Sequence, residues 1–307
     1  MPAFLERVSQ YIYTHYKDNL SELCIVLPNR RAQLFLKNHL SIAYGKPVWA
    51  PKIFSIEDFI ADLSGADIMD NLSTAFEFYS VYSDIEKDKA QSVDEFLQWA
   101  PTLLHDFNEM DQYLVNADGL FAYLSEAHAI STWNLDGKPL TDFQKKYLSF
   151  WKSLATYYTA FVNHVQAKGL VYQGLAYRMV EAESVKLAQA KNWHKIIFAG
   201  FNALNTAEEN IFKALAQAQL ADILWDSDVY YAQDKNQEAG TFIRKFKKDF
   251  SGYNKEKKFL WEEDVLSTTQ KKIVIAGVAQ HIGQAKVAGE ILNEISLDRK
   301  SAWRERV

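Results

Sequence analysis

The fold is decided by the stretch LCIVLPNRRA, residues 23–32. Its first five residues are all apolar, which is typical of a strand buried on both faces of a parallel sheet. Pro28 ends this strand, and Asn29 is suited to cap the helix that follows. The segments at residues 195–199 and 221–225 are also mostly apolar and are predicted to be strands. We therefore predict that these three segments lie side by side in one parallel sheet of an α/β domain.

A long stretch without sheet-like patterning separates the first strands from the later ones. A short strand is expected near residues 52–54, and Ser55 is expected to cap the next helix. From about residue 72 to residue 187, apolar residues recur at helical spacing. The order α/β, all-helical, α/β predicts a helical insertion into an α/β domain. A last strand is expected at residues 272–277, followed by a helix over residues 280–295.

Composition places the chain among ordinary globular proteins. It has 307 residues, 48% of them hydrophobic, and a formal net charge of −5. The single cysteine, Cys24, lies in the first apolar run and is expected to be a small buried residue. The N-terminus lacks the pattern of a secretion signal, and no apolar run approaches the roughly 18 residues of a membrane span. We therefore expect a cytoplasmic protein with no membrane contact.

Charge is distributed unevenly along the chain. Residues 55–130 contain sixteen Asp or Glu and two Lys, so their net charge is 2 − 16 = −14. Residues 241–258 contain seven Lys or Arg and two acidic residues, which gives 7 − 2 = +5. Because the acidic segment repels phosphates, we expect any nucleic-acid contact to lie elsewhere.

The common motifs of nucleotide-dependent and hydrolytic enzymes are absent from the sequence. Both Gly-Lys pairs, at residues 45–46 and 137–138, are followed by proline, so neither belongs to a phosphate-binding P-loop. There is no Gly-x-Ser-x-Gly elbow, and the seven histidines form no metal-binding pair with a carboxylate. We expect neither a cofactor nor ATPase or nuclease activity in this chain.

Asp226 and Asp228 follow the apolar run at residues 221–225. Carboxylates at the carboxyl end of a strand are the groups that bind Mg²⁺ in many α/β proteins. The same residues also form turns by accepting hydrogen bonds from their own backbone. Since no further ligand converges on them in the sequence, we favour the turn over the metal site.

Two basic clusters are candidates for DNA contact. Arg30 and Arg31 fall at a predicted helix N-terminus, where free backbone amides attract phosphates. The second cluster lies on a predicted helix and consists of Arg244, Lys245, Lys247 and Lys248. Both clusters have an alternative interpretation as solvated surface, which the sequence leaves open.

Seven segments, taken in their order and spacing, resemble one known family. They are Ile25–Ala32, Ile53–Phe59, Asp106–Leu114, Phe198–Leu204, Trp225–Tyr231, Glu238–Gly240 and Ile282–Lys286. Together they resemble the N-terminal region of the AddB/RexB-like proteins, which are inactivated superfamily I helicases fused to a PD-(D/E)XK nuclease. The resemblance covers about residues 1–295.

This resemblance implies a P-loop NTPase-like helicase core domain interrupted by an all-helical 1B-like insertion. Residues 1–68 and 191–265 would form helicase domain 1A, and residues 69–190 the insertion. Residues 270–307 would begin a second, truncated helicase-like domain, whose exposed edge favours oligomerisation. Asn29, Arg30 and Arg31 are the matching positions for a DNA-backbone contact.

The family processes broken DNA ends for recombinational repair together with an active helicase subunit. Its P-loop and nuclease residues have no counterpart here, so neither activity is carried over. We expect a non-catalytic scaffold that binds single-stranded DNA or duplex ends. Two alternatives remain: a module that binds an active helicase subunit without touching DNA, and a metal-dependent enzyme centred on Asp226 and Asp228.

Overall fold

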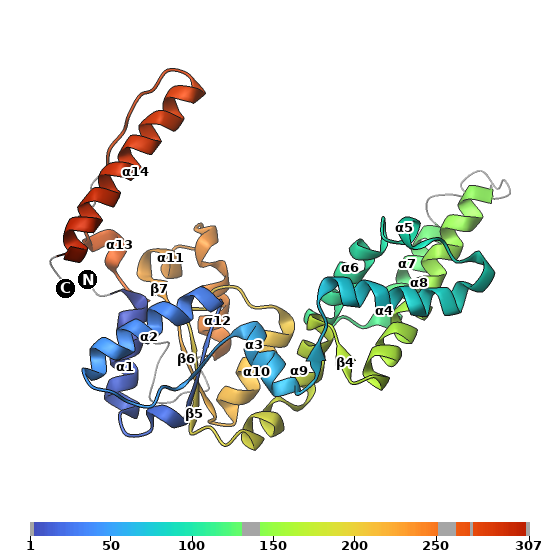
Figure 1. Ribbon diagram of the computed structural model, residues 1–307, viewed down its shortest axis with the longest axis horizontal. Coiled ribbons are helices and arrows are strands. Elements are labelled where there is room, and N and C mark those ends of the chain that lie inside the picture. The colour runs from blue at the N-terminus through green and yellow to red at the C-terminus, as the bar shows by residue number, and fades with distance from the viewer. Residues whose placement is uncertain (1–2, 131–141, 251–261, 271–272, 305–307) are drawn as a thin grey trace. The chain divides into compact units, whose positions relative to one another are not determined.

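Four parallel strands form the central sheet in this computed structural model, which describes residues 3–130, 142–250, 262–270 and 273–304 (Figure 1). Their order is β2 (Lys52–Ser55), β1 (Leu23–Leu27), β5 (Lys195–Ala199) and β6 (Ala221–Leu224). In register, Ile25 is opposite Ile53 on one side and Ile197 on the other. The prediction that the three apolar runs lie side by side in one parallel sheet is confirmed.

Helices cover both faces of this sheet. Leu23, Ile25 and Leu27 pack with α1 (Phe4–Tyr16) and α2 (Arg30–Tyr44). The alternate residues Cys24 and Val26 face the opposite layer, made of α3 (Ile56–Ser64), α9 (Gln173–Ala190) and α10 (Thr206–Gln217). All five residues of β1 are fully buried, as expected for a central parallel strand, and Cys24 is a free buried thiol.

The helix starts follow the capping residues expected from the sequence. The side chain of Asn29 accepts a hydrogen bond from the amide of Ala32 at 3.0 Å. Ser55 likewise accepts from the amide of Asp58, and Asn205 from the amide of Glu208. Gly45 ends α2 with a φ of +58°, which only glycine adopts without cost. These caps fix where each helix leaves the carboxyl edge of the sheet.

A helical segment lies between β3 (Asp67–Ile68) and β4 (Leu170–Val171), which pair in parallel. Ile68 is the register partner of Val171, so the segment begins and ends at one place. The elements of this segment are α4 (Asn71–Glu86), η2 (Lys87–Lys89), α5 (Val93–Phe96), α6 (Ala100–Gln112), α7 (Ala117–Ile130) and α8 (Asp142–Ala167). The short helix η1 (Leu20–Glu22) lies outside this segment, directly before β1. Sequence periodicity missed β3 and β4, because two residues are too short to display an alternation.

Aromatic side chains form the core of the helical segment. The buried ring of Phe78 lies 5.4 Å from that of Phe96, 5.9 Å from that of Phe107 and 5.2 Å from that of Phe161. Aromatic pairs at such distances each add roughly 0.5–1.5 kcal/mol beyond the burial of their surface. These rings belong to a continuous hydrophobic core that also includes Val26 and Phe198 of the sheet. The segment is joined to the sheet layers through α9, which contacts α3 and α10 as well as α6.

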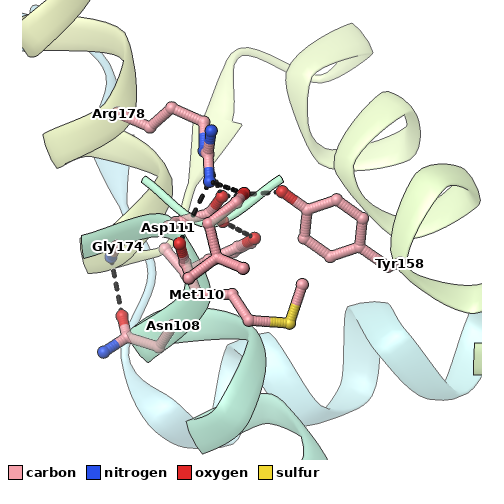
Figure 2. A network of polar contacts seen from close by, with 8 residues as sticks. Asn108, Met110, Asp111, Tyr158, Gly174 and Arg178 are labelled. Carbon is pink, nitrogen blue, oxygen red and sulfur yellow. Dashed lines mark hydrogen bonds and ion pairs between the residues drawn. The ribbon is translucent and has the colours of Figure 1, made fainter. Parts of the chain in front are cut away.

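A polar network joins α6, α8 and α9 (Figure 2). The carboxylate of Asp111 is fully buried and accepts hydrogen bonds from the hydroxyl groups of Tyr158, at 2.6 Å, and Tyr172. Arg178 donates its Nε to the same carboxylate at 2.5 Å, and a terminal nitrogen to the carbonyls of Met110 and Val115. Burial, together with the Asp111 charge, raises the pKa of both tyrosines, so both remain protonated donors.

The part of the chain that follows β6 packs on Trp225. It contains β7 (Ser227–Asp228), α11 (Val229–Gln233), η3 (Glu238–Gly240), α12 (Thr241–Phe250) and β8 (Glu262–Glu263). The Trp225 and Phe246 rings stack with centroids 5.1 Å apart, and both side chains are buried. The apolar face of α12 is thereby used inside the fold.

The chain divides into two compact units, residues 1–264 and 265–307. The second contains α13 (Val265–Thr268) and α14 (His281–Arg304), and α14 includes the helix expected from the sequence. The strand predicted at residues 272–277 is wrong over its described part: residues 273–277 form no strand, and Ile275 is 92% exposed. No strand in the described part of this unit offers a partner, and β-branched composition alone does not make a strand. Lys272 lies outside the described residues.

Among the helices that the structure describes, none combines the length and the apolar content of a membrane span.

Candidate nucleic-acid interface

The turn between β1 and α2 consists of Pro28 and Asn29. A phosphate-binding loop needs several residues, rich in glycine, whose amides surround the phosphates. Here the Asn29 side chain already occupies the amide of Ala32. The turn is therefore too short to bind a nucleoside triphosphate as a P-loop does.

Phe4 lies near the place where a sheet of this topology usually binds ligands. In a parallel α/β sheet, ligands bind where the strand order reverses, which here is between the carboxyl ends of β1 and β5. Gly200 follows β5 with a φ of +78°, and a Cβ at this position would lie 2.9 Å from the ring of Phe4. The ring of Phe4, at the start of α1, therefore packs against the backbone at the end of β5.

Arg30, one of the predicted DNA contacts, is engaged in an ion pair. Its guanidinium donates two hydrogen bonds to Asp58, at 2.7 Å and 3.1 Å. The hydroxyl of Ser55 donates to the same carboxylate at 2.7 Å. The Arg30 guanidinium holds the pKa of the Asp58 carboxyl below its usual value. Arg30 thus ties α2 to α3 across the carboxyl edge of the sheet, although its side chain is still 75% exposed.

Arg31 lies on the outer face of α2. Its guanidinium carbon is 5.9 Å from the centre of the Phe35 ring, which is 48% exposed. Arg31, Phe35, Asn38 and Ile42 follow one another at spacings of four, three and four residues, and all four are exposed. They form one stripe of α2 in which an arginine and an aromatic ring stand together.

The surroundings of this stripe are basic. From Leu23 to Ile56 there is no Asp or Glu, but there are five Lys or Arg: Arg30, Arg31, Lys37, Lys46 and Lys52. All five are exposed. Trp49, in the connection from α2 to β2, is 87% exposed. We call residues 29–55 the basic segment.

Arg30 and Arg31 were predicted from the sequence, whereas the other cations and rings of the basic segment were not. Phe35, Lys37, Lys46, Trp49 and Lys52 were not singled out. The signal was visible, because a run without any carboxylate from Leu23 to Ile56 is unusual in a chain of net charge −5. These cations do not cluster in the sequence, because they are spread over a helix, a loop and a strand.

Arg244 and Lys245 of the second predicted cluster make contacts within the fold. Arg244 donates to the backbone carbonyls of Tyr231, Asp234 and Gln237 at 2.7–2.8 Å, which fixes the turn before α12. Lys245 donates to Glu209 at 2.5 Å. Lys247 and Lys248 lie on the same helix, and the rest of the +5 segment, residues 251–258, lies outside the described residues.

Asp226 and Asp228 each make a contact within the protein. Asp226 pairs with Arg7 at 3.4 Å, and Asp228 caps α11 by accepting from the amide of Tyr230 at 2.9 Å. In the part of the chain that the structure describes, no three His, Cys, Asp or Glu side chains are grouped to hold a metal ion. The turn interpretation of Asp228 is confirmed.

Carboxylates gather on the opposite layer, at the N-termini of α3 and α10. Glu208 accepts hydrogen bonds from the amide of Asn205 and the hydroxyl of Tyr177, both at 3.1 Å. Burial raises the pKa of Glu208 above its usual value despite these bonds, and the charge of Glu57 raises it further. A phosphate is therefore favoured on the α2 side of the sheet and disfavoured on this side.

We expect Glu208→Gln to change how stability depends on pH. Because the folded-state pKa of Glu208 is raised above its ordinary value of 4.5, ionisation penalises the folded protein. The wild-type protein should lose stability relative to Glu208→Gln as the pH rises from 4.5 through the raised pKa. Urea unfolding of both proteins at several pH values measures this difference. Glu183→Gln, at a side chain that is 53% exposed, is the control, and an equal change there would contradict the assignment.

Comparison of the sequence with protein-family models and with curated proteins gives no match.

Proposed function

We propose that this chain is a non-catalytic, helicase-like scaffold that binds DNA within a double-strand-break end-processing helicase–nuclease. One observation carries the proposal: the β1–α2 turn leaves no room for a phosphate-binding loop, while α2 and the chain after it present an exposed basic and aromatic surface. The parallel sheet and the helical segment between β3 and β4 are compatible with this assignment.

The chemistry of the basic segment suits single-stranded DNA. Cations neutralise backbone phosphates, and exposed aromatic rings stack with unpaired bases at roughly 1–3 kcal/mol per base. Phe35 and Trp49 are the exposed rings of this segment, and Arg31, Lys37, Lys46 and Lys52 are its cations outside the Arg30–Asp58 pair. Duplex DNA offers the phosphates but not the unpaired bases, so we expect single strands to bind more tightly.

Anisotropy of a labelled thymidine oligonucleotide tests the proposal. With four participating cations, the logarithm of the affinity should fall against the logarithm of salt with a slope of about −3. The triple variant Lys37→Glu, Lys46→Glu, Lys52→Glu should bind about a hundredfold more weakly and reduce that slope to about −1. Trp49→Ala, which removes one stacking ring, should cost about tenfold.

A matched variant separates the surface from total charge. Lys89→Glu, Lys186→Glu, Lys235→Glu changes three exposed lysines outside the basic segment and alters the net charge equally. It should bind nearly as well as the wild-type protein. Absence of binding at about 50 mM salt would overturn the proposal, and equal weakening by both triple variants would remove the basic segment as the site. Capture of a purified active helicase subunit without DNA would favour the interaction-module alternative.

A further inference from the structure

A groove of about 390 Å³ opens between α6, α7 and α8. Its lining is mostly apolar and includes Leu103, Met110, Tyr113, Leu120, Leu124 and Leu154. Asp106 and Glu109, both on α6, are the charged residues of the lining, and both are exposed. The groove therefore combines an apolar interior with a negative edge.

The charge of this edge extends through the surrounding chain. Residues 55–130, which include α6 and α7, have a net charge of −14. Neither nucleic acid nor an anionic membrane surface is a suitable occupant, because the phosphates of both are repelled. The chemistry instead selects a positively charged partner with apolar side chains.

Arg178 holds one wall of the groove in place through hydrogen bonds to its backbone. Arg178 donates to the carbonyls of Met110 and Val115, two residues that line the groove. Figure 2 shows Arg178 beside Met110 and Asp111. The adjacent Asp111 anchors the same guanidinium. A ligand would thus meet a largely formed surface, in which the flexible Met110 side chain adapts to the shape of the apolar group it receives.

We propose that this groove binds a basic amphipathic helix of a partner protein, with apolar side chains in the groove and Lys or Arg beside Asp106 and Glu109. A helix is favoured over an extended peptide because the groove is bounded by three helices, which offer no strand edge to a β-strand. The basic helix α12 of this chain does not fill it, since Phe246 and Phe250 of α12 pack on Trp225. This inference goes beyond the proposed DNA binding and does not depend on it.

A labelled synthetic helix of leucine and lysine, with its leucines at helical spacing, is the probe. Added to the full chain, it should bind in a salt-dependent manner. The charge-reversal variant Asp106→Lys, Glu109→Lys should weaken binding about tenfold or more, because the like charges then face each other. The same peptide with serine in place of leucine should not bind, since its side chains leave the apolar interior empty.

The matched control is Asp84→Lys, Asp88→Lys, which makes the same change in net charge at two exposed carboxylates outside the groove lining. It should retain the wild-type affinity. Equal weakening by the two double variants, binding of the serine peptide, or no binding of the leucine peptide would each overturn the proposal. DNA affinity measured on the same proteins should not fall in either variant, which distinguishes this site from the basic segment.

Discussion

Replacing Asp111 by asparagine lowers the free energy of unfolding by about 3–5 kcal/mol, because the partly buried Arg178 is left without its counter-charge. The exchange also removes the charged acceptor of the Tyr158 and Tyr172 hydroxyl groups. Hydrogen bonds to charged groups each contribute roughly 1.5–3 kcal/mol. The Arg178 side chain is 32% exposed, so water compensates part of the loss and the lower end of the range is the better expectation.

Urea unfolding measures this change as a shift of the midpoint with an unchanged slope. Asp106→Asn, on the same helix but exposed, is the control and should stay within about 0.5 kcal/mol of the wild-type protein. A loss below about 1 kcal/mol for Asp111→Asn would mean that the network contributes little to stability.

Gly174→Ala should destabilise the protein by about 3 kcal/mol, at the upper end of the usual effect of overpacking. A Cβ at this position would lie 2.2 Å from the carbonyl oxygen of Asn108 and 2.9 Å from its carbonyl carbon. Both atoms belong to the backbone of α6, so no side chain can move aside. The shift would also disturb the hydrogen bond from the Gly174 amide to the Asn108 side chain, which is 2.6 Å long.

The same substitution at Gly119 provides a control with the opposite sign. Gly119 lies in α7, and the nearest atoms to a Cβ there would belong to the Asn116 side chain, at the ordinary distance of 3.5 Å. Alanine favours a helix over glycine by up to about 1 kcal/mol, so Gly119→Ala should leave stability unchanged or raise it slightly. Thermal unfolding followed by circular dichroism compares the two variants. Equal effects would show that the close approach of α9 to α6 is not limiting.

The sheet could be predicted from the sequence because three of its strands lie in predominantly apolar segments. Residues 23–27, 195–199 and 221–225 needed no knowledge of their neighbours, and the caps at Asn29, Ser55 and Asn205 depend only on residues three positions away. Residues 273–277 carry the same local signal without forming a strand. A strand also requires a partner, which no local pattern reports.

The candidate interface was only partly predictable for a related reason. Arg30 and Asp58 are 28 residues apart in sequence. They pair because the sheet brings the starts of α2 and α3 together. The internal roles of Arg244 and Lys245 likewise depend on elements that meet only in the fold. The absence of carboxylates between Leu23 and Ile56, in contrast, is a property of the sequence itself and could have identified the basic segment.

The pairing of Ile68 with Val171 has a consequence for how the chain folds. Within α4–α8, successive helices such as α7 and α8 contact each other, and contacts of this local kind form early. The contact of α4 with α8, for example between Glu77 and His164, joins residues that are 87 positions apart. Once these helices assemble, they bring the ends of their own segment together. The connection from β2 to β5 then behaves as a short one, and the entropic cost of closing it falls. The pairing of β3 with β4 thus shortens the search by which the strands of the central sheet find one another.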